Sequence, residues 1–507
     1  MLKDLKINKN DMIILSIILV ISILTKISTF YYPIGGDTVV YLNLAEEINN
    51  NLSYNLNNIE HIKFPPGWPF FLQPFLTIFG NPIVAVKIAG ILVSSLIIAL
   101  TYGISRKLNI TQKESILISA LLLFNPWFFY FSGGFLPGSD GLASLLYLGA
   151  SLFFIIAYKN GHLITKSNDK LRKRNNLFHY LVGIFLSFSW LTRVDMLFYI
   201  IPFMIYYGWD LVINRKNIFR NILVVILTGL PFFLWTLRGI LISSSVSGYD
   251  YVLKYDANNI LLSIKTIFLA ITFSSALLLP FMCIGMFFLI KKNNNKIWLI
   301  LLSGLAIHMI FFIITDTRFE ILGSLIFTIM RTRRLVIALP LLTIAVYLGL
   351  NYLKKYNKSL FHILKTVLLI YIPITIVMTL VINNGMIQER TNDVIDLGDT
   401  FTVRSYHRQQ ANDWINKHSA TDSIVLGDFD EQMKFWYVGS YLRKDLSYYD
   451  LNEENYSNLS INDLTSSKIY LISEKPSRLN DISFSYSVIF KEVINFDTIS
   501  IYESINH

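Results

Sequence analysis

Runs of about 20 consecutive apolar residues recur along most of this 507-residue chain, and no other feature constrains its fold as strongly. A run of that length crosses the hydrocarbon core of a bilayer as a single α-helix. Only 15% of the residues are charged, against about a quarter in soluble domains. The pattern therefore predicts an α-helical polytopic membrane protein. The first run is too long to be the apolar core of a secretory signal peptide.

We predict about eleven membrane-spanning helices from the positions of these runs. They fall at residues 12–32, 83–105, 115–132, 138–158, 177–192, 196–213, 218–239, 266–290, 297–315, 333–352 and 360–383. Lysines precede the first run and every second loop after it is basic, which by the positive-inside rule assigns these segments to the cytoplasm. The basic residues concerned are Lys3, Lys6, Lys9, Arg106, Lys107, Lys113, Lys170, Arg172, Lys173, Arg174, Arg215, Lys216, Lys291, Lys292, Lys354 and Lys355. An odd number of spans then puts the N-terminus in the cytoplasm and the C-terminal region outside.

Two domains are predicted from a change of composition near residue 385. Residues 1–385 form a transmembrane domain in which 33–82 and 240–265 are long outward loops. Residues 386–507 are polar enough to form a small extracytoplasmic α/β domain. Within it we expect one amphipathic helix and several β-strands. The helix is predicted at 403–418, and the strands at 423–426, at 468–472 and within 484–503.

The net charge of +10 raises the question of nucleic-acid binding. Most of the basic residues before residue 385 lie in short loops between apolar runs, where membrane topology explains them, so no nucleic-acid partner is predicted. The single cysteine, Cys283, excludes an intramolecular disulfide and is interpreted as a small buried apolar residue.

Two acidic residues occupy glycine-rich turns on the predicted outer face. Asp37 follows the first span, in Gly35-Gly36-Asp37-Thr38, and a helix is expected to run on from it along the membrane interface. Asp140 opens the fourth span after Pro137-Gly138-Ser139. Each is able to cap the N-terminus of a helix. A pair of carboxylates is also able to bind a divalent cation, or to divide general-base and positioning roles.

Basic residues near the outer face are the second candidate feature. Lys63 precedes Pro65 and Pro66, and this segment is either a rigid surface turn or a fixed backbone that presents a lysine to a phosphate. An arginine cluster opens the tenth span, on the side where basic residues should be scarce. Its members are Arg331, Arg333 and Arg334, with Arg318 nearby. Bidentate binding of phosphate explains such a cluster; contact with lipid headgroups and a misassigned topology are the alternatives.

Three further features have a structural interpretation. Residues 192–195 are interpreted as a tight outward turn in which Arg193 and Asp195 either pair with each other or line the same site. The histidines His61 and His308 are interpreted as structural rather than as metal ligands. The apolar segment 321–329 is too short to span the bilayer and is predicted to be re-entrant or interfacial.

Taken in order, these motifs resemble the C-type (GT-C) fold of multi-spanning glycosyltransferases. The resemblance rests on Asp37, Lys-x-Pro-Pro at 63–66, Asp140, Thr192-Arg193 and Arg-Arg-Leu-Val-Ile-Ala-Leu-Pro at 333–340. It is nearest to the group that holds aminoarabinose transferases and dolichyl-phosphate-mannose protein mannosyltransferases. It implies a base or metal ligand at Asp37, a second acid at Asp140, and phosphate contacts at Lys63, Arg333 and Arg334. The chain has Thr38 where that group pairs two acids, which weakens the case for a metal. It also lacks a Trp-Trp-Asp motif, which argues against transfer of a whole glycan to asparagine.

The resemblance and the motifs together predict an inverting transfer of a sugar at the outer membrane face. The donor is expected to be a polyprenyl-phosphate-linked sugar, and the acceptor a lipid, glycan or protein. The one candidate cofactor is a divalent cation, Mg²⁺ or Mn²⁺, bound by Asp37 and Asp140. A transporter or flippase of lipid-linked glycans stays an alternative, although no internal repeat supports it. A Wzy-like polymerase is the other alternative; it would keep outward arginines without needing the first-loop acid.

Overall fold

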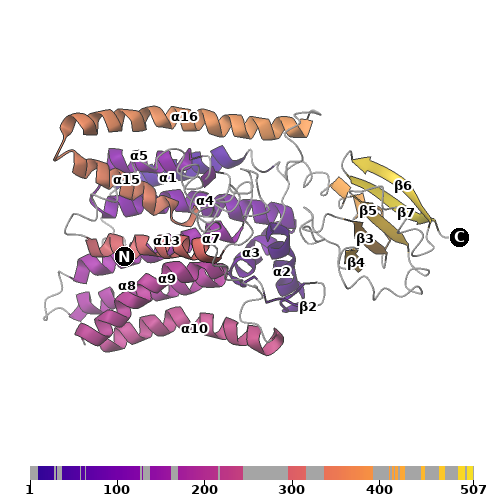
Figure 1. The fold of residues 1–507 in the computed structure, drawn as a ribbon, viewed down its shortest axis with the longest axis horizontal. Helices are drawn as coiled ribbons and strands as arrows, with labels where there is room; N and C mark the ends of the chain where they lie inside the picture. Colours follow the sequence, from indigo (N-terminus) through magenta and orange to yellow (C-terminus); the bar gives the residue numbers. More distant parts are fainter. Residues whose placement is uncertain are drawn as a thin grey trace. The chain divides into compact units, whose positions relative to one another are not determined.

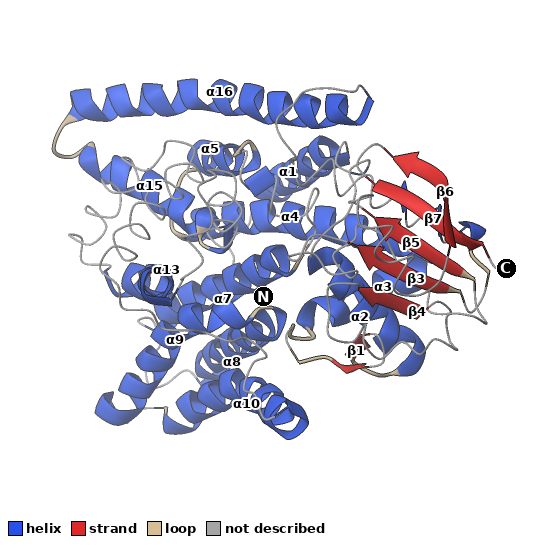
Figure 2. Ribbon diagram, turned by 45° about the vertical axis from the view of Figure 1, so that its right-hand side comes forward, coloured by secondary structure: helices blue, strands red, loops and turns tan. Residues whose placement is uncertain are grey.

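The computed structural model describes the greater part of the chain, apart from intervals of which nothing further is said (Figures 1 and 2). The described residues are 9–27, 30, 37–56, 59–62, 64–125, 128–129, 138–161, 169–214, 217–243, 295–315, 336–391, 410–411, 414–415, 417–420, 423–428, 447–450, 468–473, 489–496 and 499–505. The chain forms two compact units. Unit 1 holds residues 1–30, 58–71 and 87–382, and unit 2 holds residues 31–57, 72–86 and 383–507.

Unit 1 is a bundle of long helices that run side by side (Figure 1). They are α1 (Lys9–Ile27), α4 (Pro82–Lys107), α5 (Gln112–Leu123), α7 (Ser139–Gly161), α8 (Asp169–Thr192), α9 (Leu197–Trp209), α10 (Ile218–Ser243), α13 (Asn295–Thr315), α15 (Leu339–Leu353) and α16 (Lys358–Thr391), with short helical turns η3 (Val194–Met196) and η4 (Asp210–Asn214) around α9. Six helical segments are long and apolar enough to cross a membrane within the part of the chain that is described. The prediction of a multi-pass helical membrane protein is confirmed.

Each predicted span except 266–290 coincides with one of these helices, and 266–290 lies outside the described residues. The boundaries differ at α5, which ends at Leu123 rather than near 132, and at α8, which begins at Asp169 rather than near 177. Its first turns contain Lys170, Arg172, Lys173 and Arg174, which the hydropathy pattern assigned to a loop. Lysine and arginine are good helix formers, and their long side chains reach water from a helix end, so a basic segment does not need to interrupt the helix.

Helix α7 is the central helix of unit 1, and most of its residues are buried. It is rich in Gly, Ala and Ser, which let neighbouring helices approach closely. A Cβ added at Gly149 would lie 2.5 Å from the ring of Phe185 on α8. Helix α7 packs against α8, α8 against α10, and α9 against α13. These contacts determine which helix ends meet at the site described below.

The segment predicted as the long loop 33–82 contains two helices, α2 (Asp37–Asn51) and α3 (Gly67–Phe79), with two short strands, β1 (Asn55–Leu56) and β2 (Ile59–Glu60). Helix α2 was expected and buries Leu44 and Ala45. Helix α3 was not expected, because Gly67 and the prolines around it resemble loop residues. Proline is tolerated in the first turn of a helix, where the missing N–H has no partner to lose, and Pro69 lies there.

The C-terminal part of unit 2 contains a five-stranded sheet of order β4-β3-β5-β7-β6 (Figure 2). Its strands are β3 (Ile424–Asp428), β4 (Ser447–Asp450), β5 (Ile469–Ser473), β6 (Ile489–Phe496) and β7 (Ile499–Ile505). Strands β4, β3 and β5 are parallel, whereas β7 is antiparallel to both β5 and β6. Strands are found at all three predicted positions, and β4 is additional.

The core of this sheet joins strand residues to the helical residues before β3. Val425, Tyr470, Ile472 and Ile501 are buried together with Ala411 and Ile415 from the segment predicted as an amphipathic helix. The described residues of that segment between 410 and 418 are helical. The domain limits 1–385 and 386–507, and the side of the membrane on which this sheet lies, stay predictions.

Candidate functional site

Asp140 lies in the first turn of α7, as the second residue of the helix. It is therefore inside the helix rather than at the capping position before it. A carboxylate in the first turn interacts favourably with the partial positive charge of the helix N-terminus. The residue is 8% exposed, so its charge has to be balanced by neighbouring side chains rather than by water.

Arg193 supplies that balance from the turn between α8 and α9. Its backbone is extended, its N–H donates to the Trp190 carbonyl at 2.9 Å, and its own carbonyl accepts from Met196 N at 3.1 Å. The guanidinium Nη1 lies 2.6 Å from Asp140 Oδ1, and Nη2 lies 2.8 Å from Asp195 Oδ2. The turn predicted at 192–195 is present, and so is the pairing of Arg193 with Asp195.

The three side chains form one buried cluster, which we call the Arg193 cluster: Asp140, Arg193 and Asp195. Each member is less than a tenth exposed. Two carboxylates share one guanidinium, so the formal charge of the three side chains is −1. Asp140 and the 193–195 turn lie far apart in the sequence, and the packing of α7 against α8 joins them.

The Pro65-Pro66 turn lies directly against the end of α8, which immediately precedes Arg193. A Cβ added at Gly67 would lie 2.6 Å from the Leu191 carbonyl oxygen and 2.7 Å from Thr192 N. Only a glycine allows such a close approach to the end of α8. Pro65 is buried and Pro66 is partly buried. The turn therefore meets the residues that immediately precede Arg193, and Lys63 itself lies outside the described residues.

The start of α15 reaches the same end of unit 1. Ser144 Oγ, one helical turn beyond Asp140 on α7, donates to the Ile337 carbonyl at 3.3 Å. Val336 and Ile337 are fully buried. The arginines Arg331, Arg333 and Arg334, together with Arg318 and the segment 321–329, lie outside the described residues. Asp37 is the first residue of α2 in unit 2, and its side chain is likewise outside them.

Sequence reasoning missed Arg238, near the end of α10. Its Nη1 donates to the His61 carbonyl at 2.8 Å, and its guanidinium lies 5.1 Å from the Trp235 ring. The signal was present: like the predicted arginine cluster, Arg238 is a basic residue at the end of a span where the charge pattern leaves basic residues scarce. His61 accepts a hydrogen bond from Phe64 N at 3.1 Å, as expected of a structural histidine.

The described residues do not offer a good set of metal ligands. Among them, no group of three or more His, Cys, Asp or Glu side chains is arranged to hold an ion. The carboxylate of Asp140 already contacts a guanidinium, which a divalent cation would have to displace. His308 is buried on α13, stacked against Phe198 with ring centroids 5.0 Å apart. We therefore derive no step through a metal.

Comparisons with known proteins bear on the fold. Residues 63–235 match the family described as dolichyl-phosphate-mannose-protein mannosyltransferase. ArnT from Cupriavidus metallidurans bound to undecaprenyl phosphate is similar over 97% of each chain, with 12% identity and a TM-score of 0.64. Its apo state is similar over 98% of each chain with the same identity and TM-score. The Archaeoglobus fulgidus oligosaccharyltransferase, in complex with Zn and sulfate, is similar over 96% of this chain and 73% of its own, with 12% identity and a TM-score of 0.50. No curated protein matches by sequence.

These likenesses extend over nearly the whole chain, and the family match covers the segment that holds the Pro65-Pro66 turn, Asp140 and the 193–195 turn. The fold implied by the sequence resemblance is thereby confirmed. The chain is a multi-pass membrane protein with the GT-C fold of ArnT, and its residues 63–235 match the dolichyl-phosphate-mannose-protein mannosyltransferase family.

Proposed function

We propose that this protein is a membrane glycosyltransferase that moves a sugar from a polyprenyl-phosphate carrier to a lipid, glycan or protein acceptor. The fold supports the proposal, because ArnT shares it and has been seen with undecaprenyl phosphate bound. The charge pattern of the loops supports placing the reaction on the outer face of the membrane, with the N-terminus in the cytoplasm and the C-terminal region outside.

The observation that carries the proposal is the meeting of three distant segments at one end of unit 1. The Pro65-Pro66 turn packs on the end of α8, Arg193 of the following turn contacts Asp140, and Ser144 contacts the start of α15. Two of these segments, the Pro65-Pro66 turn and the start of α15, adjoin a predicted phosphate contact in the sequence. Lys63 lies two residues before Pro65, and Arg334 lies three residues before Ile337.

The chemistry needs a base and a stabilised leaving group. Asp37 takes the proton of the acceptor hydroxyl while its oxygen attacks the anomeric carbon from the face opposite the phosphate. The bond from that carbon to the phosphate oxygen breaks, and the carrier phosphate leaves with the electron pair. Lys63, Arg331, Arg333 and Arg334 stabilise the charge that develops on it. An ordinary aspartate is a weak base, so much of the rate comes from holding the two reactants together.

In this scheme the Arg193 cluster is a fixed part of the site wall rather than the base. Arg193 holds the Asp140 carboxylate, so the negative charge of Asp140 keeps a fixed position in this wall. Binding of Mg²⁺ or Mn²⁺ at Asp37 and Asp140 stays a separate proposal, which a chelator tests directly.

The deciding experiment offers purified protein a panel of polyprenyl-phosphate sugars and measures release of the carrier phosphate, with and without chelator. We expect release from at least one donor, and a decrease of about 10²-fold or more in the Asp37→Asn variant, the usual contribution of a general base. Asp210→Asn, on the η4 turn, is the matched control and should keep its turnover. A transporter or flippase would release no carrier phosphate from any donor. Normal turnover of Asp37→Asn would exclude Asp37 as the base.

A further inference from the structure

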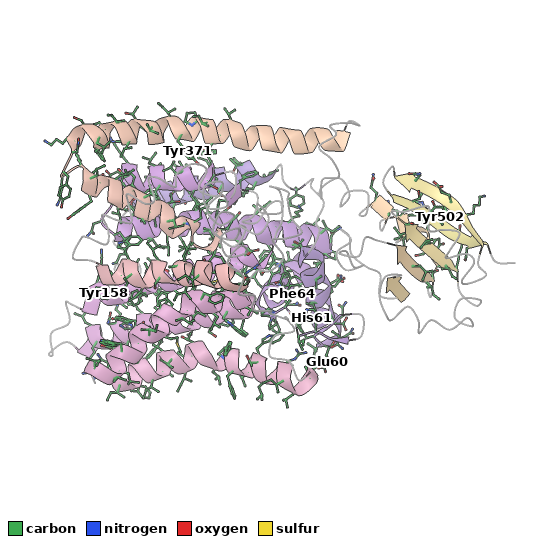
Figure 3. All side chains as sticks on the ribbon, in the orientation of Figure 1. Glu60, His61, Phe64, Tyr158, Tyr371 and Tyr502 are labelled. Carbon is green, nitrogen blue, oxygen red and sulfur yellow. The ribbon has the colours of Figure 1, made fainter. Side chains whose placement is uncertain are left out.

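We propose that Arg238 and His61 are positioning residues that hold the Lys63 segment in place for the donor phosphate. The inference deepens the proposed function and rests on it. Figure 3 labels Glu60, His61 and Phe64 on the segment that leads into α3. All of these residues belong to unit 1, as does α10.

His61 and Phe64, which lie on the two sides of Lys63 in the sequence, contact each other. The Phe64 backbone N–H donates to His61 Nε2 at 3.1 Å. The two rings are stacked, with centroids 5.4 Å apart and planes inclined by 17°. Phe64 is buried, so this contact is packed within the protein rather than surrounded by solvent. The residues adjoining Lys63 are thus held by one hydrogen bond and one ring contact.

Arg238 ties the closed segment to a helix. Its guanidinium donates to the His61 carbonyl at 2.8 Å and lies 3.9 Å from the Glu60 carboxylate. The same guanidinium lies over the Trp235 ring, one turn earlier on α10. The hydrogen bond to the His61 carbonyl and the contact with the aromatic face limit the freedom of the guanidinium, so Arg238 couples the backbone of residue 61 to α10.

The other side of the turn is held by α8, through the close approach of Gly67 to Leu191 and Thr192. The segment that contains Lys63 is therefore fastened to α10 before the lysine and to α8 after it. A lysine is a flexible point charge, and placing it within reach of one phosphate requires its backbone to be fixed. Both anchoring helices are packed against each other. Arg238 and His61 act on the phosphate only through this backbone.

The test measures the affinity of purified full-length protein in detergent for undecaprenyl phosphate, used as the probe without a sugar. The variants are Lys63→Ala, Arg238→Ala and the double variant. Each single variant should weaken binding roughly tenfold, the order expected when one partner of a partly buried polar contact is removed. The double variant should bind no more weakly than Lys63→Ala alone, because Arg238 acts through Lys63.

Arg220→Ala is the matched control, since Arg220 forms an ion pair with Asp210 at the other end of α10. It should leave the affinity unchanged. Additive losses in the double variant, or unchanged affinity in Arg238→Ala, would overturn the inference while leaving the proposed function standing. A wild-type protein that neither binds the probe nor transfers sugar would refute the proposed function itself.

A second pair of variants covers the case in which Arg238→Ala does not fold. His61→Phe keeps the ring contact with Phe64 and removes the hydrogen-bond acceptor, whereas His61→Gln keeps an acceptor. The inference predicts weakened binding in His61→Phe and a smaller loss in His61→Gln. Equal affinity of both variants and the wild type would contradict it. Normal affinity of Lys63→Ala would also contradict it.

Discussion

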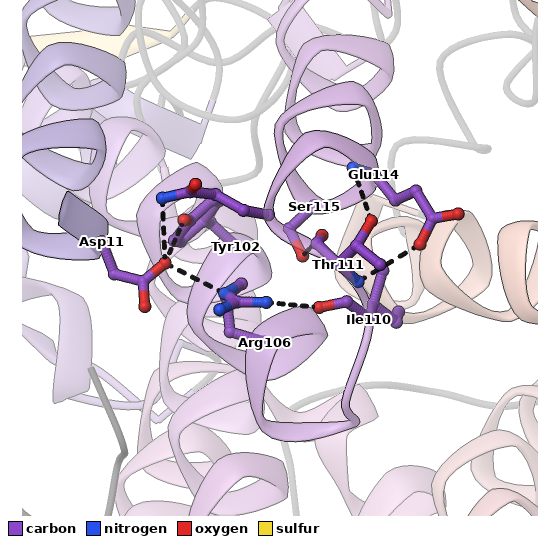
Figure 4. A network of polar contacts seen from close by, with 8 residues as sticks. Asp11, Tyr102, Arg106, Ile110, Thr111, Glu114 and Ser115 are labelled. Atoms are coloured by element: carbon purple, nitrogen blue, oxygen red, sulfur yellow. Dashed lines mark hydrogen bonds and ion pairs between the residues drawn. The ribbon is translucent and has the colours of Figure 1, made fainter. Parts of the chain in front are cut away.

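Unit 1 contains two buried clusters built around an arginine, and they differ in how their charges are balanced. In the first, Asp11 accepts hydrogen bonds from Tyr102 at 2.6 Å and from Arg106 at 3.0 Å, and Arg106 also donates to the Ile110 carbonyl at 2.6 Å (Figure 4). Among the contacts of the described residues, one carboxylate meets one guanidinium there, and Tyr102 and Gln112 add neutral donors. In the Arg193 cluster, one guanidinium serves two carboxylates.

The two clusters lie on different helices, toward opposite ends of unit 1. Lys159, near the end of α7, donates to the Lys107 carbonyl at 2.7 Å, and Lys107 is adjacent to Arg106 on α4. Asp140 lies at the beginning of α7, about 28 Å away along a helix that rises 1.5 Å per residue. The cluster around Asp11 and Arg106 fastens α1 to α4 and α5. The Arg193 cluster is at the end where the Pro65-Pro66 turn and the start of α15 also meet.

The number of carboxylates that contact each arginine is one way to separate structural from functional polar groups inside a membrane protein. A buried charge is costly, and a cluster that serves stability alone is best when each charge is matched. A cluster in which two carboxylates contact one guanidinium presents a field that a bound substrate is able to use. Substitutions in and near the two clusters test that distinction.

Removing the central arginine should damage the two clusters unequally. Arg193→Ala removes the guanidinium that both buried carboxylates contact, and we expect it to lower the free energy of unfolding by about 3–5 kcal/mol and to abolish sugar transfer. In Arg106→Ala, Asp11 keeps Tyr102 as a donor, and the Arg106 side chain is already 24% exposed. A loss of about 1–3 kcal/mol with normal turnover of the folded protein is expected.

Unfolding of both variants in detergent, with turnover measured per folded molecule, checks this contrast. Equal losses of stability and activity in the two variants would show that charge balance does not separate the clusters.

Glycine substitutions probe the backbone near each cluster. A Cβ at Gly67 meets the Leu191 carbonyl oxygen at 2.6 Å, so Gly67→Ala should cost about 1–3 kcal/mol and reduce transfer. Gly103 lies on α4 three residues before Arg106, and a Cβ there meets nothing within 4 Å. Gly103→Ala should stabilise the helix by up to about 1 kcal/mol and leave transfer unchanged. Thermal unfolding and turnover of the two variants decide; a tolerated Gly67→Ala would mean that the turn is free to move.

An ion pair on the surface of the sheet should contribute least to the free energy of unfolding. Lys468 pairs with Glu503 on the sheet, and this hydrogen bond raises the pKa of Lys468 above its usual 10.5. Because the folded-state pKa is raised, the stabilisation is present at neutral pH and is lost as the pH rises through that pKa. Lys468→Met should cost only about 0.2–1 kcal/mol at pH 8, since the lysine side chain is largely exposed to solvent. Unfolding midpoints of variant and wild type should converge above pH 10.5; a constant difference would point to packing instead of charge.

Local patterns account for much of what could be predicted. Helices occupy the described predicted spans because the length of an apolar run is a property of consecutive residues. Arg193 and Asp195 are two residues apart, so their pairing could be proposed from the sequence. Helix α3 could not, because the prolines that mark loops elsewhere also fit the first turn of a helix.

The amino-acid sequence by itself determined the membrane environment, the positions of most helices, the strands β3, β5, β6 and β7 of the five-stranded sheet and the candidate acids and bases, because each depends on neighbouring residues. Only the tertiary structure decided that Arg193 holds Asp140, that Gly67 meets the end of α8, and that Arg238 reaches His61. These contacts join residues far apart in the chain. They depend on which helix faces pack together, and small residues on α7 and at the Pro65-Pro66 turn allow that packing to be close.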